Sequence, residues 1–384
     1  MDSKKLELYI HIPFCVRKCN YCDFLSAPAD EATKELYVRQ MVEEIKSQSQ
    51  FYSEYTVSSI FFGGGTPSIL KSVFITNILS AIYATFKVEA TAEITLECNP
   101  GTVSQERLLN YKAAGVNRLS FGLQSTNNSE LKVLGRIHTY EDFLESYELA
   151  RKAGFQNINV DLMSALPGQK QESWKITLKK VAALKPEHIS AYSLQIEEGT
   201  PFYAMYSSEE GRELLPDEET DRNMYHDTRD ILEGLGYKRY EISNYAKEGF
   251  ECRHNVGYWT GVEYLGLGLG ASSYCMGRRF KVGSDLKEYL HQDFSKDLTY
   301  CYQEIEELTQ KDKMSEFMFL GLRLTGGVSA GEFYERFNLN MFEIFDYAIS
   351  KNQKYDLLEV EMPYIRLTRK GLDVANTVMA DFLL

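Results

Sequence analysis

Three cysteines lie close together near the start of the chain, in the stretch CVRKCNYCDF at residues 15–24. They are Cys15, Cys19 and Cys22, and the position two residues beyond the last of them is Phe24. Zinc sites and most iron–sulfur sites take four ligands. Three thiolates on one short loop therefore predict a metal centre that keeps one coordination position free.

The centre that suits this loop is a 4Fe–4S cube, in which three cysteines leave one iron open. An open iron can be chelated by the amino and carboxylate groups of S-adenosylmethionine (SAM). One electron from the cluster then breaks the sulfonium C–S bond and yields a deoxyadenosyl radical, chemistry that the cofactor carries. The spacing by itself leaves two alternatives open, a zinc site completed by His11 or Asp23 and three unligated thiols.

The composition narrows the class of protein. The chain has 384 residues, 44% of them hydrophobic and 25% charged, which is typical of a soluble globular protein with more than one core. A net charge of −13 argues against a partner made of nucleic acid and against a polybasic membrane contact. We find no signal sequence and no stretch that approaches an integral membrane segment, so we expect a cytoplasmic protein with reduced thiols.

Short apolar runs alternate with longer amphipathic segments from residue 7 to about residue 245. The runs are LYIHI, VSSIFF, AEITLE, VNRLSFG, QNINVDLM and HISAYSL, and the segments with helical spacing lie at 35–48, 69–86, 104–114, 140–153 and 172–184. Six strand–helix units predict a parallel sheet covered by helices. Because right-handed crossovers curl such a sheet and eight units would close it, the α/β fold we expect is an open, partial (β/α)6 barrel.

Polar residues fall where these predicted strands end, which is where folds of this class place their sites. GGGTPS at 63–68 follows a strand, and its glycines let the backbone approach the methionyl ammonium group of SAM closely. Arg136 can donate two parallel hydrogen bonds to the methionyl carboxylate. Glu97, Gln124 and Asp161, each at the end of a strand, can bond the ribose hydroxyls or the ammonium group.

The rest of the chain has a different pattern. Residues 246–300 are predicted to be a loop-rich connection, and residues 301–384 to hold helices at 304–320, 329–337 and 341–351, a two-stranded hairpin in LLEVEMPYIRLT and a last helix. We therefore divide the chain at 1–245, 246–300 and 301–384. The last part is predicted to be a winged-helix-like α+β cap that covers the barrel. Its basic residues alternate with acidic ones, so no stripe for DNA binding forms.

Six stretches taken together resemble a known family. YIHIPFCVRKCNYCDF, FFGGGTPS, ITLECNPGT, RLSFGLQS, LGRIHT and NVDLMSALPGQ are similar to radical SAM proteins related to oxygen-independent coproporphyrinogen III oxidase. The resemblance implies a partial barrel and a cluster on the three cysteines. It also implies that the following residues line SAM: Tyr9, Tyr21, Gly64, Gly65, Thr66, Glu97, Gln124, Arg136 and Asp161.

Two departures favour one branch of that family. The oxidase carries a fourth cysteine where this chain has Phe24, and an N-terminal extension where only 14 residues precede Cys15. Both features resemble the HemW branch, which is similar to heme chaperones and carries the motif H-N-x-x-Y-W. The matching residues in HNVGYW are His254, Asn255, Tyr258 and Trp259.

Elementary chemistry supports a heme site at this motif. Heme iron accepts an imidazole readily, which makes His254 the expected axial ligand, and Tyr258 and Trp259 offer flat faces to a porphyrin. The alternative for His254 is a hydrogen-bonded core histidine. Five other histidines compete as ligands, namely His11, His138, His188, His226 and His291.

We therefore predict a protein that binds a 4Fe–4S cluster, SAM and heme, and that transfers heme to an acceptor protein. An electron donor must reduce the cluster. The alternative is an enzyme that converts the propionates of coproporphyrinogen III to vinyl groups by radical oxidative decarboxylation. A zinc-dependent regulatory module with a winged-helix tail is a third, more distant class.

Overall fold

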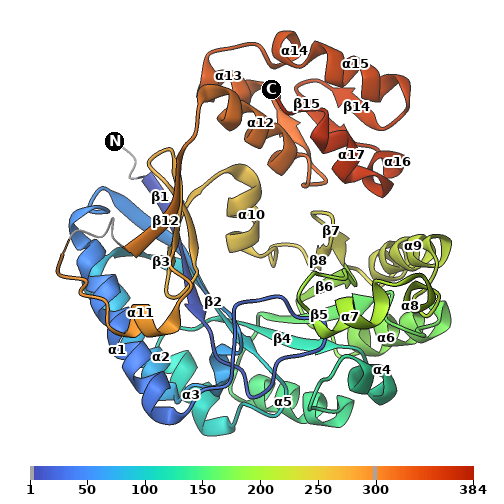
Figure 1. Ribbon diagram of the computed structural model, residues 1–384. Coiled ribbons are helices and arrows are strands. Elements are labelled where there is room, and N and C mark those ends of the chain that lie inside the picture. The colour runs from blue at the N-terminus through green and yellow to red at the C-terminus, as the bar shows by residue number, and fades with distance from the viewer. Residues whose placement is uncertain (1–3, 297–300) are drawn as a thin grey trace.

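The computed structural model describes residues 4–296 and 301–384 (Figure 1). Six parallel strands lie side by side in chain order at the centre of one large sheet. They are β1 (Lys4–Ile12), β2 (Tyr55–Gly64), β3 (Lys87–Cys98), β4 (Arg118–Gln124), β5 (Ile158–Ser164) and β6 (His188–Ser193). The six predicted strands and the open, partial barrel are confirmed.

Helices connect these strands and cover the outside of the sheet (Figure 1). They include α1 (Glu31–Ser47), α2 (Ser72–Thr85), α3 (Gln105–Ala113), α5 (Tyr140–Lys152) and α6 (Gln171–Ala183). Local chemistry sets where they begin: Asp30 caps α1 by accepting from the Thr33 amide, and Thr139 and Asp142 form a capping box at α5. Each of the five predicted helices is present, with ends shifted by a few residues.

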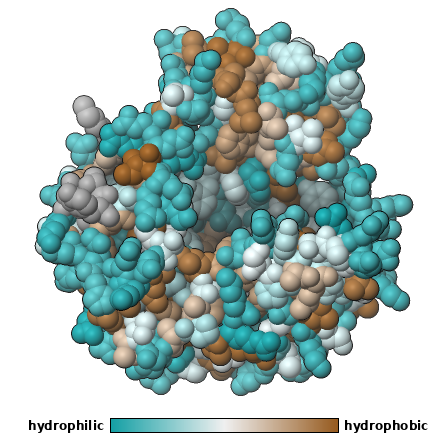
Figure 2. Space-filling view, in the orientation of Figure 1, coloured by the Kyte–Doolittle hydropathy of each residue, from teal (hydrophilic) through white to brown (hydrophobic). Residues whose placement is uncertain are grey.

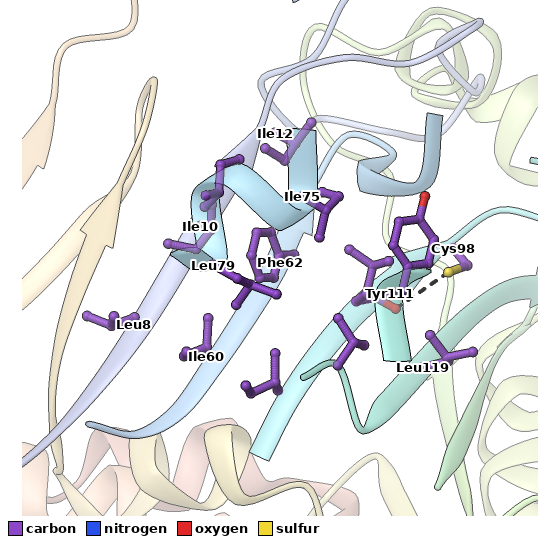
Figure 3. Packing of buried hydrophobic residues seen from close by; sticks show 14 of the residues in the cluster. Leu8, Ile10, Ile12, Ile60, Phe62, Ile75, Leu79, Cys98, Tyr111 and Leu119 are labelled. Carbon is purple, nitrogen blue, oxygen red and sulfur yellow. Dashed lines mark hydrogen bonds between the residues drawn. The ribbon is translucent and has the colours of Figure 1, made fainter. Parts of the chain in front are cut away.

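Alternation along β1 separates the core from the barrel interior. Leu8, Ile10 and Ile12 pack outward against Ile75 and Leu79 of α2 (Figure 3). The alternate residues Glu7, Tyr9 and His11 turn to the opposite face, since successive side chains of a strand alternate. The polar groups of the strands therefore gather inside the barrel.

The sheet continues beyond the barrel on both sides, to twelve strands. The strand β9 (Glu263–Leu267) pairs in parallel with β1, and β10 (Ser272–Cys275), β11 (Arg278–Val282) and β12 (Tyr302–Glu307) follow it in antiparallel order. On the other side, β8 (Asn244–Ala246) and β7 (Lys238–Arg239) are added to β6.

One sequence prediction is wrong here. The connection predicted at 246–300 is described as far as residue 296, and there it holds α10 (Arg253–Thr260), β9, β10, β11 and α11 (Leu286–Leu290). The helix predicted from 304 begins only at 310, as α12 (Gln310–Gly321), after a capping box at Thr309. The residues before it form β12, because pairing with β11 and the packing of Tyr302 on Phe280 hold them extended.

The C-terminal part forms a separate small unit. It contains α12, α13 (Ala330–Phe337), α14 (Met341–Ile344), α15 (Asp346–Lys354), α16 (Arg369–Asp373), α17 (Ala375–Ala380) and the strands β13 (Val328–Ser329), β14 (Leu358–Glu361) and β15 (Tyr364–Leu367). Its apolar side chains form a second cluster around Phe333. The predicted hairpin is β14–β15, joined by β13 as a third strand, and the helix predicted at 341–351 is broken at Phe345.

This unit stands above the open end of the barrel, and α10 lies between the two parts (Figure 1). α10 packs against α12 on one side and against β2 and β9 on the other. The described residues contain no helix that is both long enough and apolar enough to cross a membrane. The division of the chain at 245 and 300 stays a prediction, since the packing itself forms two large cores.

Candidate functional site

The cysteine loop runs between β1 and α1 and is closed at its base. Phe14 and Ala27 form an isolated bridge, and the Cys15 amide donates to the Ala27 carbonyl at 3.2 Å. Within the loop, the Cys22 amide donates to the Cys19 carbonyl at 3.3 Å. All three cysteines are half-buried and free of disulfides. The loop therefore presents three thiols from a fixed base.

The surroundings of these thiols test whether they fit an iron–sulfur cluster. Burial raises the pKa of the Cys22 thiol to about 11, so a metal must displace its proton. No three His, Cys, Asp or Glu side chains in the described part of the chain are gathered to hold a single metal ion, which gives the zinc alternative no support. A cube binds its cysteines on separate irons, so they need not converge on one point, and a set of thiolates suits iron–sulfur clusters. The donor set fits the cluster.

The glycine run is tied to the cysteine loop. The amides of Gly65 and Thr66 donate to the carbonyls of Ile12 and Phe14, each at 2.8 Å. A Cβ on Gly65 would lie 2.6 Å from the Phe14 oxygen, so no larger residue fits without moving backbone. Thr66 also places its hydroxyl 3.4 Å from the Cys15 sulfur. The run thus holds the cysteine loop against β2 in addition to any ligand it contacts.

Two carboxyl groups predicted to contact SAM lie buried inside the barrel. Burial, and then the nearby charge of Asp161, raise the pKa of Glu97 to about 8, although the amide of Gly64 donates to it. Burial also raises the pKa of Asp161, which accepts from Ser120 at 3.1 Å and from Asn159 at 2.8 Å. Two like charges in one interior disfavour each other, so Glu97 carries a proton near neutral pH.

Arg136 joins the strand ends to the cysteine loop. Its guanidinium donates to the Cys19 sulfur at 3.5 Å, to Asn99 Oδ1 at 2.8 Å and to the carbonyl of Gly122. It also bonds Tyr21, another of the residues predicted to line SAM. Sequence reasoning did not single out Asn99, although its place directly after β3 could have indicated it.

Gln124 is the strand-end residue with an unusual backbone. It is buried at the end of β4 with a φ of 73°, in the left-handed region that a glutamine rarely adopts. Of the residues predicted to line SAM, which we call the rim residues, Glu97 and Gln124 lie at the ends of β3 and β4, whereas Tyr9 and Asp161 lie within β1 and β5.

Tyr9 and His11 form a pair on the inner face of β1. The Tyr9 hydroxyl lies 3.2 Å from His11 Nδ1, and the other ring nitrogen of His11 lies 2.9 Å from the Leu25 carbonyl. Tyr9 stacks on Phe61 with ring centroids 6.4 Å apart, and Phe61 stacks on His254 at 5.1 Å. A column of rings thus connects the cysteine loop to α10.

His254 is enclosed beneath α10. It is 1% exposed, its Nδ1 lies 2.8 Å from the Ser59 hydroxyl, and its Nε2 lies 3.0 Å from the Tyr258 hydroxyl. Burial, and then the charge of Arg118, lower its pKa to about 3. His254 therefore has the environment of a neutral, hydrogen-bonded core histidine, and both ring nitrogens are engaged. Asn255, the next residue of the motif, is half-buried on the same helix.

A cavity of about 720 Å³ opens between the cysteine loop, α10 and the C-terminal unit. Figure 2 shows the molecule hollowed between its upper and lower parts. The barrel side is lined by Tyr9, His11 and Phe24, and the helix side by Tyr258 and Trp259. The volume lies within the roughly 300–1,000 Å³ typical of cofactor sites.

Of the six histidines, all within the described residues, only His11 is among the residues that line this cavity. Besides His254, described above, four histidines are held elsewhere by hydrogen bonds: His138 by Leu123, His188 by Asn159 and Tyr240, His226 by Asp373, and His291 by Lys287.

Comparisons with known proteins agree with this geometry. Residues 9–181 match the radical SAM superfamily, and residues 308–374 match the HemN C-terminal domain. The chain is 36% identical to a protein of Lactococcus lactis named heme chaperone HemW, over 100% of this chain and 99% of that protein. It is 35% identical to the heme chaperone HemW of Bacillus subtilis, over 98% of each chain.

A solved structure shows the same fold. The radical SAM enzyme coproporphyrinogen III oxidase (HemN) of Escherichia coli superposes with a TM-score of 0.85 and 24% identity, over 99% of this chain and 90% of that one. The predicted α/β radical SAM fold with a C-terminal domain is confirmed. Radical SAM proteins hold a 4Fe–4S cluster and SAM, so the family implies both cofactors here. By its matches over the full length, this chain belongs to the HemW family of radical SAM proteins.

Proposed function

We propose that this protein is a heme chaperone, which binds heme and transfers it to an acceptor protein. Its relatives over the full length carry the name heme chaperone HemW. The observation that carries the proposal in this chain is the cavity of about 720 Å³, because it joins the cysteine loop to the aromatic pair Tyr258 and Trp259.

The lining of the cavity suits an amphipathic, dianionic macrocycle. Tyr258, Trp259 and Tyr264 supply flat aromatic surface for a porphyrin. Arg279 and Lys281 lie on the same wall, where they pair with Glu316 and Glu304, and they can also attract the two propionates. Such cations are informative in a chain whose net charge is −13.

The cofactor residues proposed are those of the rim. Cys15, Cys19 and Cys22 would hold the cluster. SAM would be lined by Tyr9, Tyr21, Gly64, Gly65, Thr66, Glu97, Gln124, Arg136 and Asp161. When bound, the reduced cluster supplies an electron to SAM, which requires an electron donor. We propose that the cycle takes place in the cytoplasm, where heme-accepting proteins and reductants meet.

The competing function is oxidation of coproporphyrinogen III. The likeness to HemN at 24% identity concerns the fold alone. At the position of the oxidase's fourth cysteine this chain has Phe24, which is 59% exposed and lines the cavity. The cysteine of the oxidase motif is thus replaced by an apolar side chain on the wall of the proposed heme site.

One preparation tests both functions. After anaerobic reconstitution, the chain should bind heme at about one per chain and should form no protoporphyrinogen from coproporphyrinogen III with SAM and reductant present. Transfer is measured by mixing the loaded protein with an apo-hemoprotein and following the spectrum of the acceptor. Turnover of coproporphyrinogen III, or the lack of any heme binding, would overturn the proposal.

A further inference from the structure

His254 and Tyr258 face opposite environments although they are neighbours on α10. Residues four apart lie on one side of a helix, and here they are joined by the 3.0 Å contact between His254 Nε2 and the Tyr258 hydroxyl. His254 points into the protein and is 1% exposed. Tyr258 lines the cavity of about 720 Å³. A molecule in the cavity therefore meets the phenol and not the imidazole.

The imidazole has no free position for a metal. Nδ1 of His254 is occupied by Ser59 and Nε2 by Tyr258, and the flat face of the ring is stacked on Phe61. To ligate an iron, His254 would have to break the bond to Tyr258 and leave the core. Tyr258 already lines the cavity, but burial raises the pKa of its phenol well above the usual value, so the iron must displace the phenol proton. Tyrosine is an established ligand of ferric heme in other proteins.

A chain of hydrogen bonds beneath α10 points at the phenol oxygen. Glu7 is buried and bonded to Ser59; its Oε2 accepts no hydrogen bond and lies 3.8 Å from His254 Nδ1, as suits a neutral acid rather than a carboxylate. Burial raises its pKa to about 9. A protonated Glu7 donates to Ser59, and Ser59 then donates to Nδ1 of His254. His254 therefore carries its own proton on Nε2 and donates it to Tyr258, whose hydroxyl hydrogen is left free.

Gly257 shows how closely this chain is packed. A Cβ at Gly257 would lie 2.0 Å from Glu7 Oε1, so the helix approaches the carboxyl as far as glycine allows. The position of the phenol is thus fixed from below by Glu7, Ser59 and His254.

We propose, resting on the proposed function, that Tyr258 is the protein ligand of ferric heme in this cavity and that His254 is a positioning residue that holds its oxygen. On binding, the O–H bond of Tyr258 breaks and an O–Fe(III) bond forms. The proton is released to buffer, and no oxidant or reductant takes part. His254 stays neutral and continues to donate to the phenolate, which stabilises the anion.

The test is a titration of the full-length chain with hemin, read by resonance Raman and absorption spectroscopy. The wild type should show the vibrations and the charge-transfer band of an iron-bound tyrosinate. Tyr258→Phe should lose both and should still unfold cooperatively, at a somewhat lower temperature because the buried His254 loses its hydrogen-bond partner. Tyr264→Phe removes another phenol from the same cavity and should keep the tyrosinate signature.

His254 variants separate positioning from ligation. His254→Ala should keep the tyrosinate signature, shifted in frequency, and weaken binding about 10–100-fold, as is common when a partner of a ligand is lost. His254→Gln, whose amide can still donate, should restore part of the affinity. A wild-type spectrum of histidine ligation that His254→Ala abolishes would overturn the proposal, as would an unchanged spectrum in Tyr258→Phe. A wild type that binds no hemin would instead overturn the heme chaperone function itself.

Discussion

The rim of the barrel and α10 carry the two groups of candidate residues, and they differ in how the fold uses them. At the rim, Glu97 and Gln124 end β3 and β4, and Arg136, from the segment between β4 and α5, donates to the Cys19 sulfur. On α10, His254 is buried, whereas Tyr258, one turn further along the same side of the helix, lines the cavity.

The difference has a physical cause. Strand ends of a parallel sheet all open toward the same edge, so a polar residue there meets the ligand whatever its type. A helix that packs between two parts of a protein does not direct its side chains toward one ligand, and burial decides which of them have a structural role. The histidine of a motif can therefore support the position of another side chain, while the tyrosine one helical turn away contacts the ligand.

The largest effect expected at the rim is complete loss of the cluster. Anaerobically reconstituted protein should hold about four iron and four sulfide per chain. Cys15→Ala, Cys19→Ala and Cys22→Ala should each abolish this content. Cys98→Ala, which removes a buried sulfur that bonds the Leu96 carbonyl and Ser68, should retain it. If the chain instead bound one zinc ion and no iron, the proposed 4Fe–4S cluster and its radical chemistry would be ruled out.

Loss of the rim cation should have the next effect. Arg136→Ala should weaken SAM binding by about 1.5–3 kcal/mol, the contribution of a charge-assisted hydrogen bond, and leave the iron content unchanged. Calorimetry on reconstituted protein measures the affinity. Arg107→Ala is the matched control, because Arg107 bonds the carbonyls of Ser68 and Thr102 near the same rim without touching the cysteine loop. Equal affinities in Arg136→Ala and wild type would take Arg136 out of the SAM site.

A methyl group at the glycine run should disturb the rim sterically. Gly65→Ala should lower the free energy of unfolding by about 1–3 kcal/mol, because its Cβ would press on the Phe14 and Ile12 carbonyls. Urea unfolding of the cluster-free chain measures this. Gly234→Ala, in a helix with open space around it, should raise stability by up to about 1 kcal/mol. If both variants behaved alike, the close approach at Gly65 would not matter.

The last prediction is a pH dependence that comes from the support beneath α10. The pKa of Glu7 is raised to about 9 from 4.5, so between these values the folded chain keeps a proton that the unfolded chain releases. Stability therefore falls as pH rises through this window. Relative to Glu7→Gln, wild type should lose about 1.4 kcal/mol per pH unit from about pH 5 to pH 9.

Glu44→Gln is the control for this pH dependence. The pKa of Glu44 is raised by burial to about 7, so its effect on the slope should end near pH 7, two units earlier. Parallel pH profiles for wild type and Glu7→Gln would show that Glu7 is ionised in the folded protein. The direction of hydrogen bonds toward Tyr258 would then lose its support.

Much of the rim was determined by local sequence. The six apolar runs specify strands by composition and spacing, and GGGTPS and Glu97 lie at the strand ends, as predicted, whereas Asp161 lies within β5. The three cysteines need only a closed loop of 14 to 27 to be brought together. Such features depend on residues within about one strand–helix unit, and for that reason they can be predicted from the sequence alone.

The tertiary structure alone decided the rest. β12 is a strand because β11 and Phe280 are beside it, although its own residues fit a helix. The extension of the sheet through β9 depends on pairing with β1, more than 250 residues earlier in the chain. His254 is a support and Tyr258 a wall of the cavity because α10 is pressed between the barrel and α12. Which residues of a helix are buried depends on the parts of the protein that pack against it, and the local sequence does not specify those parts.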